Sequence, residues 1–251
     1  MPMLGGRGAQ EHRPLLLRSV VEWSIPENRR ERPLARRRRS WLLEETLGMD
    51  LIIRAAQMDD VPAMGRLAVA TFITAHRGHI SEEVWAKRRD EWSVEDSARN
   101  WACTLRAIAD GTNPRECVYL AVDETCDEVI GIAMGQPAYE EPWPNTGAIK
   151  VLYVLQAYQG RGLGRRLVQV VARHLRRLGM SALTIAVLKA NVPAQRFYEA
   201  IGGQFVQVGE IEDSGYMLPE IVYGWADTET LIDAAGRDPI GRSIDLGANR
   251  R

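Results

Sequence analysis

Hydrophobic and polar positions repeat with two different periods along this chain, and each period predicts one kind of secondary structure. Runs of β-branched and aromatic residues predict strands, whereas apolar residues three or four positions apart predict helices. The two patterns meet in the stretch VLYVLQAYQGRGLG, residues 151–164. An apolar run is followed there by Gly160, Gly162 and Gly164, and helical spacing begins at Leu163. We therefore predict a buried strand, a glycine turn and a helix in this order.

The rest of the pattern predicts an α/β fold in which strands outnumber helices. Strands are expected at 51–55, 117–122, 128–134, 146–154, 182–187, 204–208 and 217–225, and helices are expected to begin near Val61, Glu82, Val94, Leu163 and Val192. Because a helix separates strands 146–154 and 182–187, these two strands are expected to run parallel. The predicted fold is a mixed, mainly antiparallel central sheet with a parallel βαβ core, flanked by helices.

The two ends of the chain differ from the middle in composition. Residues 1–48 are rich in Arg, Pro and Gly, and seven arginines fall within 29–39, a composition that favours disorder. We interpret this run as a solvated tail rather than as a contact to nucleic acid or acidic membrane. Met49 directly precedes the first predicted strand and is a candidate start of the native protein. Residues 228–251 are expected to form a loose tail, which leaves 49–227 as the folded domain.

Composition narrows the class of protein. With 251 residues, 45% of them hydrophobic, the chain can bury a full core. A formal net charge of −1 gives no electrostatic basis for nucleic acid as the main partner. Cys103, Cys117 and Cys126 lack metal-ligand spacing and cannot form a closed disulfide set, so reduced thiols in a cytosolic protein are expected. No membrane span is expected, because no run of about eighteen apolar residues occurs.

The glycine turn is a candidate anion site. Glycine lets the backbone bend sharply and lets a ligand approach without meeting a Cβ atom, and the first amides of a helix have no intrahelical partners. Arg161, Arg165 and Arg166 lie at the same end of the helix, where positive charge is unfavourable unless an anion is bound. A phosphate group is the expected occupant, and a tight turn in an arginine-rich protein is the alternative.

Two common phosphate-binding motifs do not fit this turn. A dinucleotide fingerprint needs a third glycine where the chain has Arg165, and an acidic residue near 182–186, where none occurs. A P-loop needs Gly-Lys-Ser or Gly-Lys-Thr, and neither triplet occurs in the sequence. The pattern that remains is Gln159-x-x-Gly162-x-Gly164 after a strand.

This pattern resembles the acyl-CoA signature of the GNAT superfamily of N-acetyltransferases, and the resemblance extends from about Ile52 to Trp225. It implies that the two central parallel strands splay apart and that the pantetheine arm of the cofactor lies in the gap. It also implies that amides of the glycine turn hold the pyrophosphate, while backbone groups at the end of the preceding strand bind the pantetheine amides and the thioester carbonyl. The implied cofactor contacts are Leu152, Tyr153, Val154, Gln159, Gly160, Arg161, Gly162, Leu163, Gly164, Arg165 and Asn191.

The helix in NVPAQRFYEAIG contains the candidate catalytic residue, Tyr198. Asn191 and Tyr198 are two helical turns apart, so a ligand that passes the helix can touch both. A tyrosine with a reference pKa near 10 can protonate the thiolate of a thiol whose pKa is about 8.5. Tyr198 thus resembles the general-acid tyrosine of the family, and Asn191 its cofactor-contacting asparagine. The alternative is that Phe197 and Tyr198 are both core aromatics.

The sequence departs from the family where a general base is expected. Many members carry a glutamate on the strand before the glycine turn or on the next strand, but the matching positions here are Ala148 and Ala186. Because neither side chain takes a proton, either the amine arrives neutral or another residue substitutes. No metal is expected, since His76 and His79 have no third ligand nearby in the sequence. The candidate substitute bases are Glu140, Glu141, Glu220 and His79.

We therefore expect a cytoplasmic, acetyl-CoA-dependent N-acetyltransferase that transfers an acetyl group to a primary amine of a small molecule, amino acid or peptide by direct attack. A non-catalytic acyl-CoA-binding module is the first alternative, because both glutamates are missing. A scaffold domain with a basic interaction tail is the second, and a homodimer is compatible with the sequence. The acceptor depends on loops around His76, Glu140 and Asp213, which carry no recognisable motif.

Overall fold

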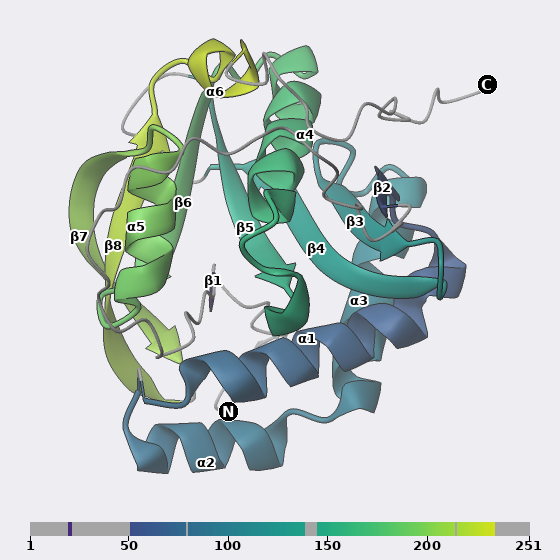
Figure 1. Cartoon of the computed structure of the whole chain (residues 1–251), viewed down its shortest axis with the longest axis vertical. Helices are drawn as coiled ribbons and strands as arrows, with labels where there is room; N and C mark the ends of the chain where they lie inside the picture. The colour runs from purple at the N-terminus through teal and green to yellow at the C-terminus, as the bar shows by residue number, and fades with distance from the viewer. Residues whose placement is uncertain (1–19, 22–50, 79, 139–144, 214, 234–251) are drawn as a thin grey trace, which may run out of the picture.

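The computed structural model describes residues 20–21, 51–78, 80–138, 145–213 and 215–233 (Figure 1). In this part of the chain, every strand and helix that the hydrophobic pattern predicts is present. The strands are β1 (Val20–Val21), β2 (Leu51–Ala55), β3 (Cys117–Asp123), β4 (Glu128–Pro137), β5 (Thr146–Val154), β6 (Ala182–Leu188), β7 (Gln204–Asp213) and β8 (Tyr216–Trp225). The helices are α1 (Val61–His76), α2 (Glu82–Glu91), α3 (Val94–Ala109), α4 (Leu163–Arg177), α5 (Val192–Ala200) and α6 (Glu229–Asp233), with 3₁₀ turns at Met58–Asp60 and Gln156–Tyr158.

The strands form one mixed sheet in the order β2-β3-β4-β5-β6-β8-β7, and β1 pairs with β5 outside this order. β5 and β6 are parallel and are connected through α4, whereas the other neighbours in the order are antiparallel. The predicted fold class is therefore confirmed: a mainly antiparallel sheet contains one parallel βαβ unit.

Helices cover both faces of the sheet and bury two apolar clusters. On one face, Leu167 and Val171 of α4 and Tyr198 of α5 are fully buried against the strands. On the other face, α1 and α3 cover β3, β4 and β5, and they bury Met64 and Phe72. Figure 1 shows α4 and α5 in front of the sheet and α1 below it. Because β5 and β6 lie in the middle of this sandwich, a ligand reaches their backbone only where the strands separate.

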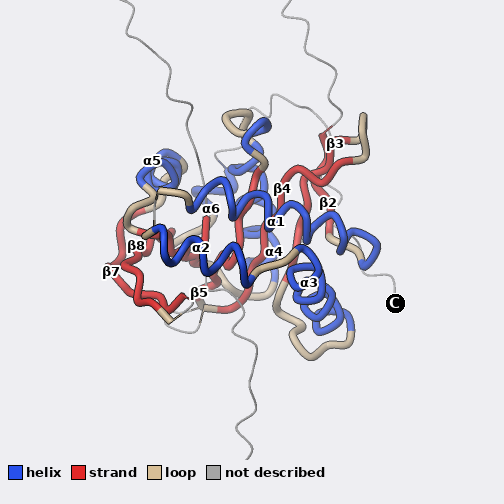
Figure 2. Tube along the Cα trace, turned by 90° about the horizontal axis from the view of Figure 1, so that it is seen from below, coloured by secondary structure: helices blue, strands red, loops and turns tan. Residues whose placement is uncertain are grey.

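The tip of the β7–β8 hairpin lies against α2, and Figure 2 shows the two side by side. The Tyr216 hydroxyl donates to the Glu83 carboxylate at 2.8 Å, and Arg88 forms an ion pair with Asp213. The Arg88 guanidinium also lies over the Phe72 ring, 5.2 Å from its centroid. One of the three loops expected to shape the acceptor site is thus held by α2. Three of the candidate substitute bases, His79, Glu140 and Glu141, lie outside the described residues.

The packed structure extends past both predicted domain boundaries. Residues 228–233 were expected in a loose tail, but Leu231 is only 1% exposed and its carbonyl accepts a hydrogen bond from Gln169 of α4 at 2.9 Å. At the other end, Val20–Val21 fall inside the region expected to be disordered and form β1. The rest of 1–48 and of the C-terminal tail lies outside the described residues. Both differences arise from contacts with distant segments, which composition alone does not reveal.

Candidate functional site

The two parallel strands separate next to a bulge in β5. Met134 and Gly135 are consecutive in β4, but their partners in β5 are Val151 and Ile149, so Lys150 is an extra residue. The pairing of β5 with β6 also ends at Ile149, and from there β6 continues along β8. The predicted gap between the parallel strands therefore opens at the bulge, and the β5 backbone from Val151 onward borders it.

Part of this β5 edge carries a second partner. Val20 is aligned with Val151 and Val21 with Leu152 in a parallel register. Farther along, the Gln159 side-chain amide donates to the Val154 carbonyl at 3.0 Å. In the structure, Leu152 thus has a strand partner and the Val154 carbonyl accepts a hydrogen bond. These contacts involve residues far apart in the sequence or in a turn, so the apolar run did not reveal them. The cofactor contacts that the resemblance implies for 152–154 stay a prediction.

The glycine turn joins this strand to α4 and forms the amino end of the helix. Gly160 and Gly162 have φ values of +73° and +81°, and an added Cβ atom at either position would meet nothing within 4 Å. Gly162 is the N-cap of α4, without a side-chain cap, and its carbonyl accepts from the Arg166 amide at 3.1 Å. The amides of 163–165 consequently have no intrahelical partners. The turn leaves open space in front of the amides that an anion can bind.

Polar atoms around this turn lack partners within the described part of the chain. Gln159 Oε1 and Arg165 Nε are buried and have no hydrogen-bond partner there. Leaving one such atom unsatisfied costs roughly 1–3 kcal/mol, so a ligand that satisfies them is favoured. The Arg161 guanidinium lies 5.5 Å from the centroid of the Tyr158 ring, which adds positive charge beside the turn. The helix amides and the Arg165 donor therefore fit a negatively charged ligand such as a diphosphate, whereas Gln159 Oε1 is an acceptor and needs a donor.

Tyr198 combines a packed ring with an unsatisfied hydroxyl. Its ring centroid lies 5.3 Å from that of Phe197, 5.9 Å from that of Tyr223 and 6.5 Å from that of Trp225. The side chain is 0% exposed, and its hydroxyl has no hydrogen-bond partner among the described residues. Burial raises the pKa of Tyr198 well above its usual value. The group therefore holds its proton at neutral pH and is available as a donor to a ligand that reaches it.

Asn191 begins α5 as predicted. Its side-chain oxygen accepts a hydrogen bond from the Ala194 amide at 3.1 Å, and the residue is 2% exposed. Its structural role is therefore that of an N-cap. Its expected contact with a cofactor stays a prediction.

The positions where a glutamate base was expected share one face of the sheet. Ala148 is the neighbour of Thr184 in β6, and Ala186 follows two residues later on the same face. Both alanines are half-buried. Glu220, one of the candidate substitutes, lies on β8 opposite Leu188, on this same face. Of the four candidate substitute bases, Glu220 is the one that lies within the described residues, and it shares a sheet face with the two alanines.

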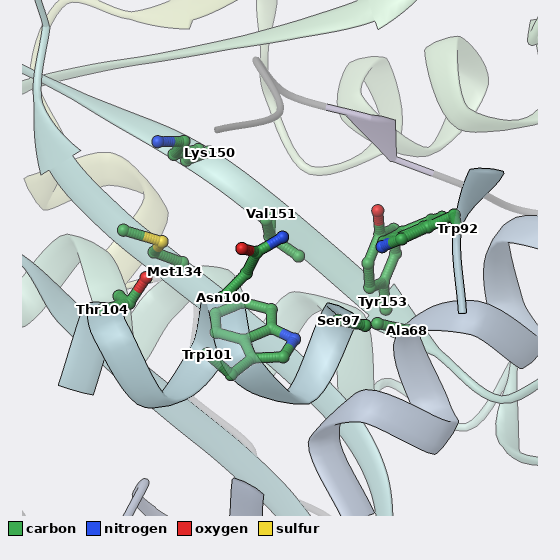
Figure 3. Close-up of a pocket in the computed structure, with 10 residues that line it drawn as sticks. All are labelled: Ala68, Trp92, Ser97, Asn100, Trp101, Thr104, Met134, Lys150, Val151 and Tyr153. Atoms are coloured by element: carbon green, nitrogen blue, oxygen red, sulfur yellow. The ribbon is translucent and has the colours of Figure 1, made fainter. Parts of the chain in front are cut away.

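A small cavity of about 40 Å³ lies between α3 and the strands β4 and β5, next to the bulge. In Figure 3, Trp92 and Tyr153 lie at one end, Met134 and Thr104 at the other, and Asn100 and Trp101 between them. Of these residues, only Tyr153 was expected at the site, as a cofactor contact. The sequence pattern that could have identified this lining is the spacing of Ser97, Asn100 and Thr104. It places three polar side chains on the face of α3 that packs on the sheet.

Other kinds of site find no support in the described residues. No group of three or more His, Cys, Asp or Glu side chains there is arranged to hold a metal ion. Within the same residues, no helix has the length and hydropathy to cross a bilayer. The glycine turn thus offers backbone amides and arginines that can bind an anion, while Tyr198 on α5 keeps a protonated hydroxyl.

Comparison with known proteins points to one family. The model of the acetyltransferase (GNAT) family matches residues 78–203, about half of the chain. YuaI of Bacillus subtilis (strain 168), an uncharacterized N-acetyltransferase, is 32% identical over 114 residues. This alignment covers 45% of the chain and 65% of YuaI, so the chain spans somewhat less than two thirds of that relative's length.

Solved structures share the fold at low sequence identity. An N-acetyltransferase from Staphylococcus aureus Mu50 superposes with a TM-score of 0.52 at 15% identity, over 70% of this chain and 98% of its own. PaiA N-acetyltransferase from Thermoplasma acidophilum, solved with coenzyme A, superposes with a TM-score of 0.53 at 17% identity, over 68% of this chain and 98% of its own. YncA from Salmonella typhimurium, solved with acetyl-CoA, superposes with a TM-score of 0.52 at 17% identity, over 71% of this chain and 95% of its own.

Proposed function

The chain belongs to the acetyltransferase (GNAT) family, and on that premise we propose that it transfers an acetyl group from acetyl-CoA to a primary amine of a small molecule, amino acid or peptide by direct attack. One observation carries the proposal: β5 separates from β6 after Ile149, and the glycine turn that follows the end of β5 opens free helix amides. Two structural neighbours were solved with coenzyme A or acetyl-CoA, which supports this choice of ligand.

The glycine turn would hold the diphosphate of the cofactor. The amides of 160–165 act as donors at the amino end of α4, and Arg161 and Arg165 supply positive charge. When bound, acetyl-CoA supplies an activated acetyl thioester. Backbone groups of 152–154 border the gap in which the pantetheine arm is expected, and they would orient that thioester.

Tyr198 would act as the general acid. Its hydroxyl is protonated and has no partner among the described residues, so it can hydrogen-bond the sulfur that leaves as a thiolate. The same burial that raises the pKa of Tyr198 would also raise the pKa of a thiol beside it. The direction of proton transfer between the two groups therefore does not follow from their pKa values in water. A general acid of this kind typically raises the rate about 10²–10⁴-fold.

The positions of Ala148 and Ala186 carry no group that can take a proton. The simplest reaction that the site supports is direct attack by an amine that arrives in its neutral form. Should the amine need a general base, Glu220 on β8 is the candidate. The bulge at Lys150 places the β5 backbone beside the cavity lined by α3. This cavity of about 40 Å³ exceeds the 10–15 Å³ that one water needs, so it can take a small part of the acceptor.

The missing glutamates also favour a second candidate, a non-catalytic module that binds acyl-CoA. The two functions make the same prediction for binding and different ones for turnover. Titration calorimetry with coenzyme A, with NADH and ATP as comparisons, tests binding. Release of free thiol from acetyl-CoA across a panel of amines tests turnover.

Tyr198→Phe separates the two candidates. In the enzyme, this variant should keep coenzyme A affinity and lose about 100-fold or more in amine-dependent thiol release. If the protein binds coenzyme A but no amine raises thiol release above the rate of spontaneous hydrolysis, the binding module is the correct function. If it does not bind coenzyme A at millimolar concentration, both candidates are wrong.

A further inference from the structure

The β5 edge that the cofactor is proposed to use is already occupied in the structure. β5 has β4 on one side along most of its length, and on the other side it has β6 only up to Ile149. Past the bulge, the second side is taken by β1, where Val20 is aligned with Val151 and Val21 with Leu152. β1 also contacts β6, so this segment lies in the gap between the two parallel strands (Figure 1).

We propose that β1 (Val20–Val21) competes with acyl-CoA for this gap, so that the chain carries its own reversible inhibitor. The inference rests on the proposed function, since it assumes that pantetheine binds the same strand edge. An extended peptide and a pantetheine arm both present amide groups that can pair with a strand edge. One edge residue, Leu152, cannot hold both partners at once. Docking of β1 and binding of the cofactor are therefore mutually exclusive.

The pairing is short enough to be reversible. Two aligned residues form a strand far shorter than the five or six that are typical, and such a pair is marginal by itself. The docked and released states can therefore coexist. The apparent dissociation constant of the cofactor then equals the intrinsic one divided by the fraction of released chain. A segment docked about nine-tenths of the time would weaken apparent affinity about tenfold.

The glycine turn lies outside the overlap. β1 covers Val151 and Leu152, whereas the helix amides and the Gln159 side chain follow the strand end. A ligand can thus bind the turn by its diphosphate first and displace β1 afterwards. Fragments of the cofactor should report this difference: a nucleotide diphosphate without the pantetheine arm should bind with the same affinity whether or not β1 is docked.

The test uses the full chain and changes only the capacity for backbone pairing. Val20→Pro/Val21→Pro removes both amide donors of the segment, whereas Val20→Thr/Val21→Thr keeps the donors and the β-branched shape. We expect the proline variant to bind coenzyme A severalfold more tightly than wild type in calorimetry, and the threonine variant to match wild type. Adenosine diphosphate should bind all three proteins equally. Similar melting temperatures would show that all three are folded.

Amide hydrogen exchange gives a second measurement on the wild-type chain. Coenzyme A should accelerate exchange in the peptide that contains Val20–Val21 while 151–154 stay protected. Equal coenzyme A affinity in all three proteins, weaker binding by the proline variant, or unchanged exchange at Val20–Val21 would overturn the competition and leave the proposed function intact. Failure of all three folded proteins to bind coenzyme A would instead refute the proposed function, and the competition with it.

Discussion

The amino end of α4 allows the site to be tested against a control at the other end of the same helix. Gly162 has a φ of +81° and Gly179 a φ of +88°, and a Cβ atom at either position would meet nothing within 4 Å. Alanine in this left-handed conformation costs roughly 1–2 kcal/mol. For a chain of this size, that loss lowers the melting temperature by about 2–8 °C. Gly162→Ala and Gly179→Ala should therefore destabilise the protein to a similar extent.

The two variants should differ in ligand binding. The methyl group of Gly162→Ala would enter the space in front of the helix amides, while Gly179 lies roughly 25 Å away along the helix. Loss of one hydrogen bond to a charged group removes about 1.5–3 kcal/mol. Because 1.4 kcal/mol corresponds to a factor of ten, we expect coenzyme A to bind Gly162→Ala roughly 10- to 100-fold more weakly. Gly179→Ala should bind it as wild type does.

Calorimetric titration with coenzyme A and thermal unfolding without ligand measure the two effects separately. If Gly162→Ala loses stability but keeps its coenzyme A affinity, the diphosphate does not bind at this turn. If both glycine variants lose affinity equally, the loss follows helix stability instead of ligand contact. Either result would refute the placement of the anion at the amino end of α4.

Three further results are expected from side chains with perturbed environments. Tyr198→Phe should unfold at or above the wild-type melting temperature, because the lost hydroxyl has no hydrogen-bond partner among the described residues. A drop of several degrees in a thermal scan would show that the hydroxyl does form a hydrogen bond. Burial raises the pKa of Cys117 to about 12. A thiol reagent at pH 8 should therefore label the exposed Cys103 and Cys126 quickly, and Cys117 only after denaturation. Fast labelling of all three cysteines in the folded protein contradicts this. Although burial opposes it, the hydrogen bond from Arg54 lowers the pKa of Asp60 below its usual value. Its stabilisation is therefore present above the usual pKa and is lost as pH falls through the lowered one. Asp60→Asn should be less stable than wild type at pH 7 in denaturant titrations, and the difference should shrink as the pH falls through the lowered pKa; a difference that does not change with pH contradicts this.

The elements that sequence predicted best are those with local signals. The change from an apolar run to glycines and then to helical spacing identified β5, the turn and α4 without any knowledge of their neighbours. The start of α5 was equally local, because an asparagine cap and Pro193 at the first turn specify a helix start by themselves. The parallel arrangement of β5 and β6 followed from the helix between them.

The features that sequence missed depend on pairing between distant segments. The extra residue Lys150 is defined only by the register of β5 on β4, and nothing in the run around it differs from a regular strand. β1 exists only because the edge of β5 is open past Ile149. The last packed turn, around Leu231, depends on the polar side chain of Gln169 on α4. In each case the partner lies more than ten residues away, beyond any local pattern.

The sequence presented Tyr198 as either a core aromatic or a catalytic acid, and the structure shows why these two interpretations do not exclude each other. The ring contacts Phe197, Tyr223 and Trp225 and is fully buried, which a phenylalanine would do as well. The hydroxyl has no partner among the described residues and costs stability until a ligand reaches it. Packing thus explains the ring and leaves the oxygen unexplained. A site that uses this oxygen needs the ring held in place, so burial of the ring fits both interpretations, and it is the unpaired hydroxyl that supports the catalytic proposal.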